Sequence, residues 1–164
     1  MTNVQAVEKH SHRGSKLNKY LTFALGHEVY ALEILMVREI IGLMEITMVP
    51  RMPDFVRGVI NLRGKVIPVI DLRRKFGMED VEETKETCII VVDINDVLMG
   101  IVVDRVSEVL DIPVEEIDET PSFGVSITTD FILGIGKVKG KVIIILDIKA
   151  VLTKEELQMM AQSF

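Results

Sequence analysis

The sequence has only one cysteine, Cys88, so no disulfide can form within the chain. It is also short of positive charge, with 19 Lys and Arg against 25 Asp and Glu and a net charge of −6. This balance disfavours a nucleic-acid partner, because binding DNA or RNA needs a basic face. No apolar run reaches the 18 or so residues that a bilayer-spanning helix needs, and the polar N-terminus has no apolar export core. These absences predict a cytoplasmic protein without direct membrane insertion.

Motifs for metal or nucleotide chemistry are also missing. No CxxC or HExxH pair occurs, so we expect no metal and no cofactor. The segment Gly58 to Lys65 is similar to a phosphate loop, but it has one residue too many between its glycines, and Val66 stands where such loops have Ser or Thr. Cys88 lies in an apolar run, where burial keeps a thiol inert. We therefore expect no catalytic site and no enzyme, although a dispersed site would leave no trace in one sequence.

The sequence is rich in residues that form strands. Apolar residues make up 48% of the chain, and Ile, Val and Leu dominate them. Two apolar runs flank a short polar turn at 26–28, and two more flank Arg63-Gly64, so hairpins are predicted over 20–32 and 56–70. A further strand is predicted over 36–42. The pattern indicates an all-β fold.

An internal repeat is the strongest organisational signal. Residues 54–76 align with 130–152 at an offset of 76, with eight identities where chance pairing would give roughly one or two. A second alignment, at an offset of 69, places Val37–Ile41 on Val106–Leu110. The chain therefore holds two copies of one unit of about five strands. Five short strands close naturally into a small barrel without long exposed edges.

The repeat and the flanking composition predict the domain organisation. Residues 1–18 are expected to be a flexible lead; His10 and His12 within it are a possible metal site or simply part of a solvated tail. One domain is expected over 19–152, with lobe one at about 19–77 and lobe two at about 86–152. The acidic stretch 79–86 between them is typical of a solvated face.

The C-terminal residues 153–164 are predicted to form an amphipathic helix that packs on the body. Thr153 and Glu156 fit a capping box. Leu157, Met160, Ala161 and Phe164 would form one apolar stripe.

Charges within apolar strands leave two interpretations open. Alternation over 36–41 puts Arg38 on one face and Glu39 on the other, each beside apolar neighbours, and Glu108 repeats the position of Glu39. Arg63 lies at a predicted hairpin tip. These charges either point into solvent or fix the register of an interaction face.

Methionine also leaves two interpretations open. The nine methionines either fill the core or provide an adaptable contact surface, as at Met44 and Met48.

The segment from Gly58 to Phe76 resembles the hallmark segment of the CheW family. The ranges 30–40, 100–110 and 131–136 resemble further segments of proteins of this family. The resemblance covers about residues 19–152. It implies two five-stranded Src-homology-3-like β-barrel lobes with a C-terminal helix, and no cofactor.

The resemblance also implies a function in chemotaxis signal transduction. Proteins of this family are adaptors that link the cytoplasmic hairpin tip of chemoreceptors to the regulatory domain of the histidine kinase CheA. They work in membrane-associated arrays that signal toward the flagellar motor. Matching residues implies a receptor-binding groove between the lobes. Its candidates are Ile34, Val37, Glu39, Arg63, Ile89 and Val109. Gly58 and Val106 are candidates for the kinase contact.

Two alternatives stay open beside the stand-alone adaptor. One is a CheW-like regulatory module of a larger signalling protein of the CheA or CheV type, and the other is a catalyst with a dispersed site. The chain holds no receiver or ATPase segment, which favours the stand-alone adaptor as an expectation.

Overall fold

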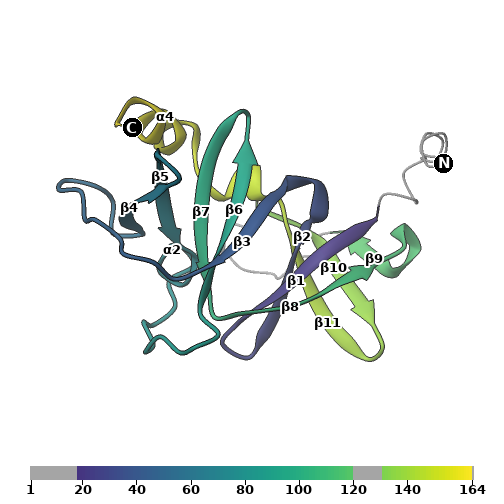
Figure 1. Cartoon of the computed structure of the whole chain (residues 1–164). Coiled ribbons are helices and arrows are strands. Elements are labelled where there is room, and N and C mark those ends of the chain that lie inside the picture. Colours follow the sequence, from purple (N-terminus) through teal and green to yellow (C-terminus); the bar gives the residue numbers. More distant parts are fainter. Residues whose placement is uncertain (1–17, 120–130, 164) are drawn as a thin grey trace, which may run out of the picture.

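The computed structural model describes residues 18–119 and 131–163, in which strands dominate (Figure 1). The strands are β1 (Lys19–Leu25), β2 (Glu28–Glu33), β3 (Val37–Gly42), β4 (Val56–Leu62), β5 (Lys65–Asp71), β6 (Cys88–Ile94), β7 (Val97–Val103), β8 (Arg105–Asp111), β9 (Ile117–Glu119), β10 (Ile132–Val138) and β11 (Lys141–Leu146). The helical segments are η2 (Ile34–Met36), α2 (Leu72–Lys75), η3 (Val114–Glu116), α3 (Ile148–Val151) and α4 (Lys154–Ser163). The predicted all-β fold with a short C-terminal helix is confirmed.

The strands form two sheets that lie side by side as two lobes (Figure 1). One sheet has six strands in the order β8-β1-β2-β11-β10-β9, and the other has five in the order β3-β6-β7-β5-β4. Each sheet therefore takes its central hairpin from one half of the chain and its other strands from the other half. The predicted assignment of lobe one to 19–77 and lobe two to 86–152 is wrong, because the two copies exchange their first hairpins.

The pairing registers follow the internal repeat residue by residue. The parallel pair Val69–Gly100 of β5 and β7 becomes Ile145–Ala31 of β11 and β2 when the offsets of 76 and 69 are applied. The antiparallel register shift at Val56/Gly58 likewise recurs at Ile132/Gly134. The two lobes are therefore related by an approximate internal symmetry. The sequence repeat predicted which strands correspond, but it did not predict which strands pair with each other in a sheet.

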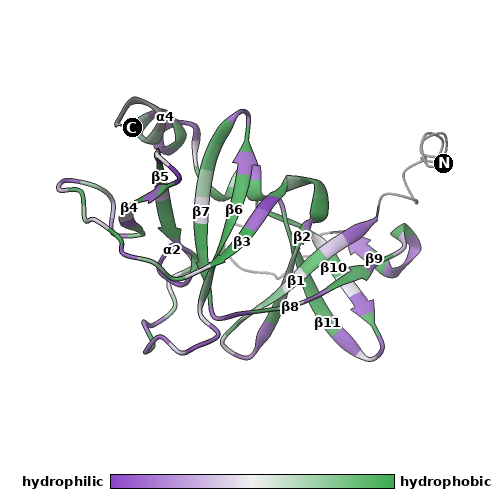
Figure 2. Cartoon of the chain, in the orientation of Figure 1, coloured by the Kyte–Doolittle hydropathy of each residue, from purple (hydrophilic) through white to green (hydrophobic). Residues whose placement is uncertain are grey.

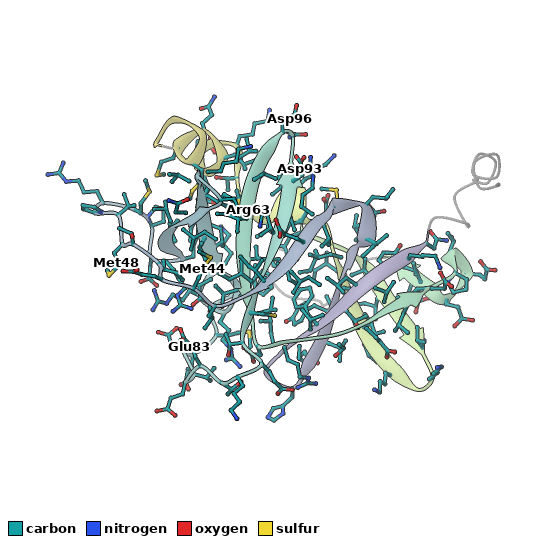
Figure 3. All side chains as sticks on the ribbon, viewed as in Figure 1. Met44, Met48, Arg63, Glu83, Asp93 and Asp96 are labelled. Carbon is teal, nitrogen blue, oxygen red and sulfur yellow. The ribbon has the colours of Figure 1, made fainter. Side chains whose placement is uncertain are left out.

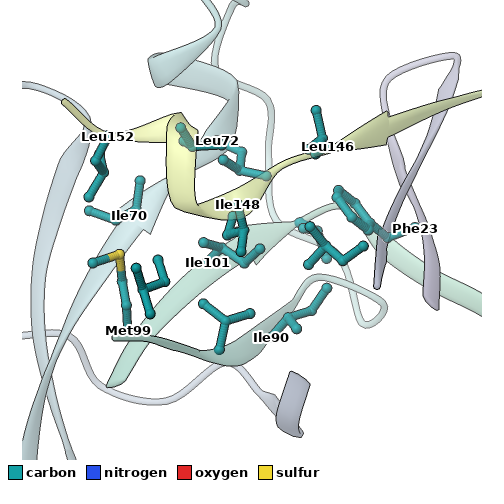
Figure 4. Close-up of a cluster of buried hydrophobic side chains, with 14 of the residues drawn as sticks. Phe23, Ile70, Leu72, Ile90, Met99, Ile101, Leu146, Ile148 and Leu152 are labelled. Atoms are coloured by element: carbon teal, nitrogen blue, oxygen red, sulfur yellow. The ribbon is translucent and has the colours of Figure 1, made fainter. Parts of the chain in front are cut away.

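One large apolar cluster lies between the two sheets, and each lobe has a smaller cluster of its own. Strand β6 shows the pattern: Ile90, Val92 and Ile94 pack in the large cluster between the two sheets, whereas Ile89 and Val91 pack inside the five-stranded lobe. Because side chains alternate along a strand, β6 is buried on both faces. Figure 4 shows side chains of the large cluster, to which Phe23 of one sheet and Ile90 of the other both belong. The hydropathy colouring of Figure 2 accordingly runs green along the central strands and purple at the turns.

The hairpin turns have the backbone that their sequence predicts. Arg63 and Gly64 have φ of 53° and 87°, and their repeat counterparts Lys139 and Gly140 have 52° and 79°. Two successive positive φ values match the twist of the flanking strands. The predicted hairpin at Arg63-Gly64 is thus confirmed.

The C-terminal helix begins as predicted. The Thr153 hydroxyl accepts a hydrogen bond from the Glu156 amide at 3.1 Å, and the Glu156 carboxylate accepts one from the Thr153 amide at 2.9 Å. Lys75 of α2 also donates to Glu156 at 2.9 Å, and Met160 is buried. The side chains of Ala161 and Phe164, and residues 1–17 with His10 and His12, lie outside the described residues.

No helix in the described ranges is long and apolar enough to cross a membrane.

Candidate functional site

The edge strand β3 carries the first group of predicted site residues. It alternates half-buried Val37, Glu39 and Ile41 with exposed Arg38 and Ile40, as the sequence pattern predicted. On its inner side β3 pairs antiparallel with β6. The chain therefore presents one charge on each face of a strand at the margin of the five-stranded sheet.

Glu39 forms an ion pair with Arg63, which lies across the sheet. Arg63 is held at the β4–β5 turn, where Asn61 accepts a hydrogen bond from the Gly64 amide at 2.8 Å. Because β3 and β4 are the two edges of this sheet, the pair shows that the sheet curls until its edges approach each other. The Glu39 side chain is 33% exposed and that of Arg63 is 69% exposed, so the pair lies at the surface (Figure 3).

The opposite face of β3 carries a second ion pair. Arg38 donates to the carboxylate of Asp93 in β6 at 2.5 Å. The charges of β3 therefore pair locally, and the side chains of Arg38 and Arg63 are 60% and 69% exposed; a role in an interaction face stays a prediction.

The repeat counterpart of β3 is β8, the edge of the six-stranded sheet. Val109 is 49% exposed, whereas Val106 is half-buried against the large cluster. The buried Thr22 hydroxyl donates to the Glu108 carbonyl at 2.8 Å and accepts from the Glu108 amide at 3.1 Å, which fixes β8 against β1. The positions of Glu39 and Arg63 correspond to Glu108 and Lys139 here, where no ion pair links the two described side chains.

The structure brings some candidates together and separates others. Ile34, Val37 and Val106 all pack against the cluster between the sheets, so they lie at the seam of the two lobes. Ile89 is fully buried inside the five-stranded lobe. The prediction that Ile89 is a direct receptor contact is therefore wrong for this conformation, because its side chain can act on a partner only through the packing of β6.

Gly58 is a structural requirement of the β4 bulge. Its φ is 142°, and a Cβ at this position would lie 2.1 Å from the Thr47 carbonyl oxygen. The Thr47 amide in turn donates to the Val59 carbonyl at 2.9 Å. Gly58 thus shapes the backbone at the sheet edge and offers no side chain to a kinase.

The loop from β3 to β4 exposes apolar side chains that composition alone could not place. Met48 is 83% and Met44 37% exposed, whereas Met52 packs against the large cluster. Leu35 in η2 is 75% exposed and Ile40 of β3 is 45% exposed. Exposed apolar side chains are common at protein surfaces, so their exposure alone does not define a contact surface.

A network of arginines and carboxylates was missed by the sequence reasoning. Asp104 accepts two hydrogen bonds from Arg73, at 2.9 and 2.6 Å, and one from the Gly26 amide at 2.8 Å. The hydrogen bond from Arg73 holds the pKa of Asp104 below its usual value. The acidic stretch 79–86 is exposed throughout, as the sequence predicted, and its Asp80 also pairs with Arg74. No local sequence signal could reveal the contacts of Asp104, because its partners Arg73 and Gly26 are 31 and 78 residues away.

Burial raises the pKa of the Cys88 thiol, which keeps it protonated and unreactive. Among the described residues no group of three or more His, Cys, Asp or Glu is placed to hold a metal ion.

Comparison with known proteins agrees with this picture. The CheW-like domain family matches residues 19–156. The chain is 40% identical over 139 residues to the chemotaxis protein CheW of Klebsiella aerogenes, covering 85% of this chain and 84% of that protein. It is 37% identical over 137 residues to CheW of Helicobacter pylori, covering 84% and 82%.

A solved structure is similar as well. The crystal structure of the scaffolding protein TtCheW from Thermoanaerobacter tengcongensis matches with a TM-score of 0.78 and 38% identity, covering 85% of this chain and 94% of that one. By contrast, the match to the chemotaxis protein CheV3 of Helicobacter pylori, at 30% identity, covers 41% of that protein.

Proposed function

Because the chain belongs to the CheW family of chemotaxis coupling proteins, we propose that it links the cytoplasmic hairpin tip of chemoreceptors to the regulatory domain of the histidine kinase CheA. The adaptor acts without catalysis and without a cofactor. It is recruited from the cytoplasm to membrane-associated receptor arrays. The alternative of a module from a CheA- or CheV-type protein has less support, because the matches that span most of both chains are to CheW proteins.

The observation that carries the proposal is the match to CheW over most of the chain, and the β3 margin supports it. In this proposal the receptor tip binds at the seam of the lobes, against Ile34 and Val37, and also contacts the exposed Val109 of β8 and the Glu39–Arg63 pair. A two-sided contact lets the binding of one partner change the affinity for the other, which is the requirement for coupling.

Two features make the Glu39–Arg63 pair suitable for a partner contact. Arg63 stands on a rigid turn, so little conformational entropy is lost when its planar guanidinium binds a carboxylate or carbonyl. Its exposure leaves donors free to reach outward. The half-buried Glu39 meanwhile orients the guanidinium.

Titration of the labelled chain with a receptor tip fragment and with the CheA regulatory domain, one at a time, tests the proposal. Arg63→Ala is expected to weaken receptor binding by about tenfold, the loss of one charge-assisted contact. Its melting temperature should change little, because an exposed ion pair contributes about 0–1 kcal/mol. Lys139→Ala is the matched control, since Lys139 occupies the same turn with φ of 52° in the other lobe. Failure of the wild-type chain to bind either partner would contradict the proposal.

A charge exchange separates the two roles of the pair. The double variant Glu39→Arg with Arg63→Glu keeps an ion pair but reverses its direction. If Arg63 contacts the receptor directly, the double variant binds as weakly as Arg63→Ala. Restored binding would show instead that the pair only shapes the lobe.

A further inference from the structure

The internal repeat places two equivalent cavities on the molecule. Each lies where a parallel strand pair meets a one-turn helix: β5 and β7 with α2, and β11 and β2 with α3. Four lining positions correspond at the repeat offsets of 76 and 69. They are Arg57 and Leu133, Asp71 and Asp147, Arg73 and Lys149, and Val102 and Glu33.

The chain itself covers the first cavity. Arg57 binds Glu83 at 2.6 Å, Arg74 binds both carboxylate oxygens of Asp80 at 3.1 Å, and Arg73 donates to the Glu79 carbonyl at 2.9 Å. Residues 79–87, here called the acidic strap, therefore run across an arginine-lined niche. The remaining cavity has a volume of about 110 Å³. The strap shows that this site of the fold accepts an extended segment.

The second cavity is larger, and most of the residues that line it are apolar. Its volume is about 280 Å³, more than twice that of the first. Buried Leu32, Leu146 and Ile148 form its floor, and the 46% exposed Leu133 stands at its side. The described residues that line it contribute no covering segment like the acidic strap.

The charged residues of the second cavity differ from those of the first. Three arginines face the strap in the first, whereas Glu33, Asp147 and Lys149 line the second. A segment that complements the second cavity must therefore bring an apolar side chain for the floor and basic side chains for the two carboxylates. Leu35, 75% exposed in η2 beside the lining residue Met36, adds apolar surface next to it.

We propose that the cavity lined by Glu33, Met36, Leu133, Asp147 and Lys149 binds an extended segment of a partner protein, with an aliphatic anchor flanked by basic residues. The partner's segment takes the place in this lobe that the chain's own acidic strap takes in the other lobe. The site lies on the six-stranded sheet and does not depend on the Glu39–Arg63 pair.

A peptide derived from the acidic strap provides the probe. It has the sequence of residues 79–87 with every Asp and Glu replaced by Lys and with Leu in place of Val81. Titrated into the ¹⁵N-labelled full chain, it is expected to shift the amide signals of 32–36, 133 and 146–149. The unmodified acidic peptide should shift none of these signals. A basic peptide with Ser in place of the Leu anchor should bind about tenfold more weakly.

Two variants of the chain test the location. Leu133→Asp should weaken binding of the basic peptide by about tenfold, because it places a charge on the apolar wall. Val142→Asp is the matched control: Val142 is 57% exposed on neighbouring β11 and does not line the cavity. Leu133→Arg, which copies Arg57 of the first cavity, should also weaken binding of the basic peptide. Both Leu133 variants should melt near the wild-type temperature.

Several outcomes would overturn the proposal. Shifts spread over acidic surfaces, or equal losses in Leu133→Asp and Val142→Asp, would indicate non-specific attraction. A dimer of the free chain that Leu133→Asp dissociates would make a second copy the occupant. Contacts from residues 120–130 of the same chain to the cavity in the free protein would make the occupant internal.

Discussion

Asp104→Asn tests the partly buried ionic network that joins the lobes. Asp104 lies between β7 and β8, and its carboxylate binds Arg73 of α2 and the Gly26 amide of the β1–β2 turn. It therefore connects elements of both sheets. Asn keeps the shape of the side chain but loses the charge. Its NH₂ group must face one of the N–H groups that now donate to the carboxylate.

The magnitude follows from the burial of the pair. The side chains of Arg73 and Asp104 are 13% and 26% exposed, so water replaces the lost bonds only in part. Hydrogen bonds to a charged group contribute about 1.5–3 kcal/mol each. If one of the two hydrogen bonds from Arg73 is lost and the other is weakened, we expect Asp104→Asn to lower the free energy of unfolding by about 2 kcal/mol. For a chain of this size that corresponds to a melting temperature lower by about 4–8 °C.

The effect should depend on pH with a defined sign. The pKa of Asp104 is lower in the folded state than its ordinary value, because Arg73 stabilises the carboxylate. Its contribution is therefore complete above the unfolded pKa of about 4 and is lost as pH falls through the folded pKa. Urea unfolding at pH 7 and near pH 3 should show that the gap between wild type and variant narrows in acid.

Asp111→Asn is the control, because the Lys19–Asp111 pair at 2.9 Å has side chains that are 54% and 70% exposed. It should change stability by less than about 0.5 kcal/mol. A loss at Asp104 no larger than that at Asp111, or a loss that persists undiminished near pH 3, would refute the reasoning.

Further predictions concern the backbone and the C-terminal helix. Gly58→Ala should destabilise the chain by about 2–4 kcal/mol in urea unfolding, because its Cβ would lie 2.1 Å from the Thr47 carbonyl oxygen. Gly64→Ala, where no atom approaches within 4 Å but φ is 87°, should cost only about 1 kcal/mol; equal losses would show that space is not the cause. Thr153→Ala should remove the cap of α4 and cost about 1 kcal/mol, measured as faster amide exchange over 154–160. Unchanged exchange would show that packing alone holds the helix.

Local features of the fold could be predicted from the sequence because short-range physics determines them. The Arg63-Gly64 turn, the Thr153–Glu156 capping box and the alternation along β3 each depend on neighbours a few residues apart. The exchange of hairpins between the copies could not be predicted. Alternation shows which face of a strand is buried, but it does not show which strand lies beside it.

The same distinction applies to the candidate site. Family resemblance pointed to Glu39 and Arg63, and the structure pairs them, although they lie on opposite edges of one sheet. Ile89 followed the same alternation as its neighbours, yet its face is the interior of the lobe. The Arg73–Asp104 contact joins α2 to the segment between β7 and β8, 31 residues apart, a separation over which no periodic pattern operates.

The most direct test of the central claim is co-sedimentation with membrane vesicles that carry a chemoreceptor. If the chain couples receptor and kinase, CheA sediments with the vesicles when the wild-type chain is added, and markedly less with Arg63→Ala than with Lys139→Ala. Sedimentation of CheA that is the same with and without the chain would contradict the account.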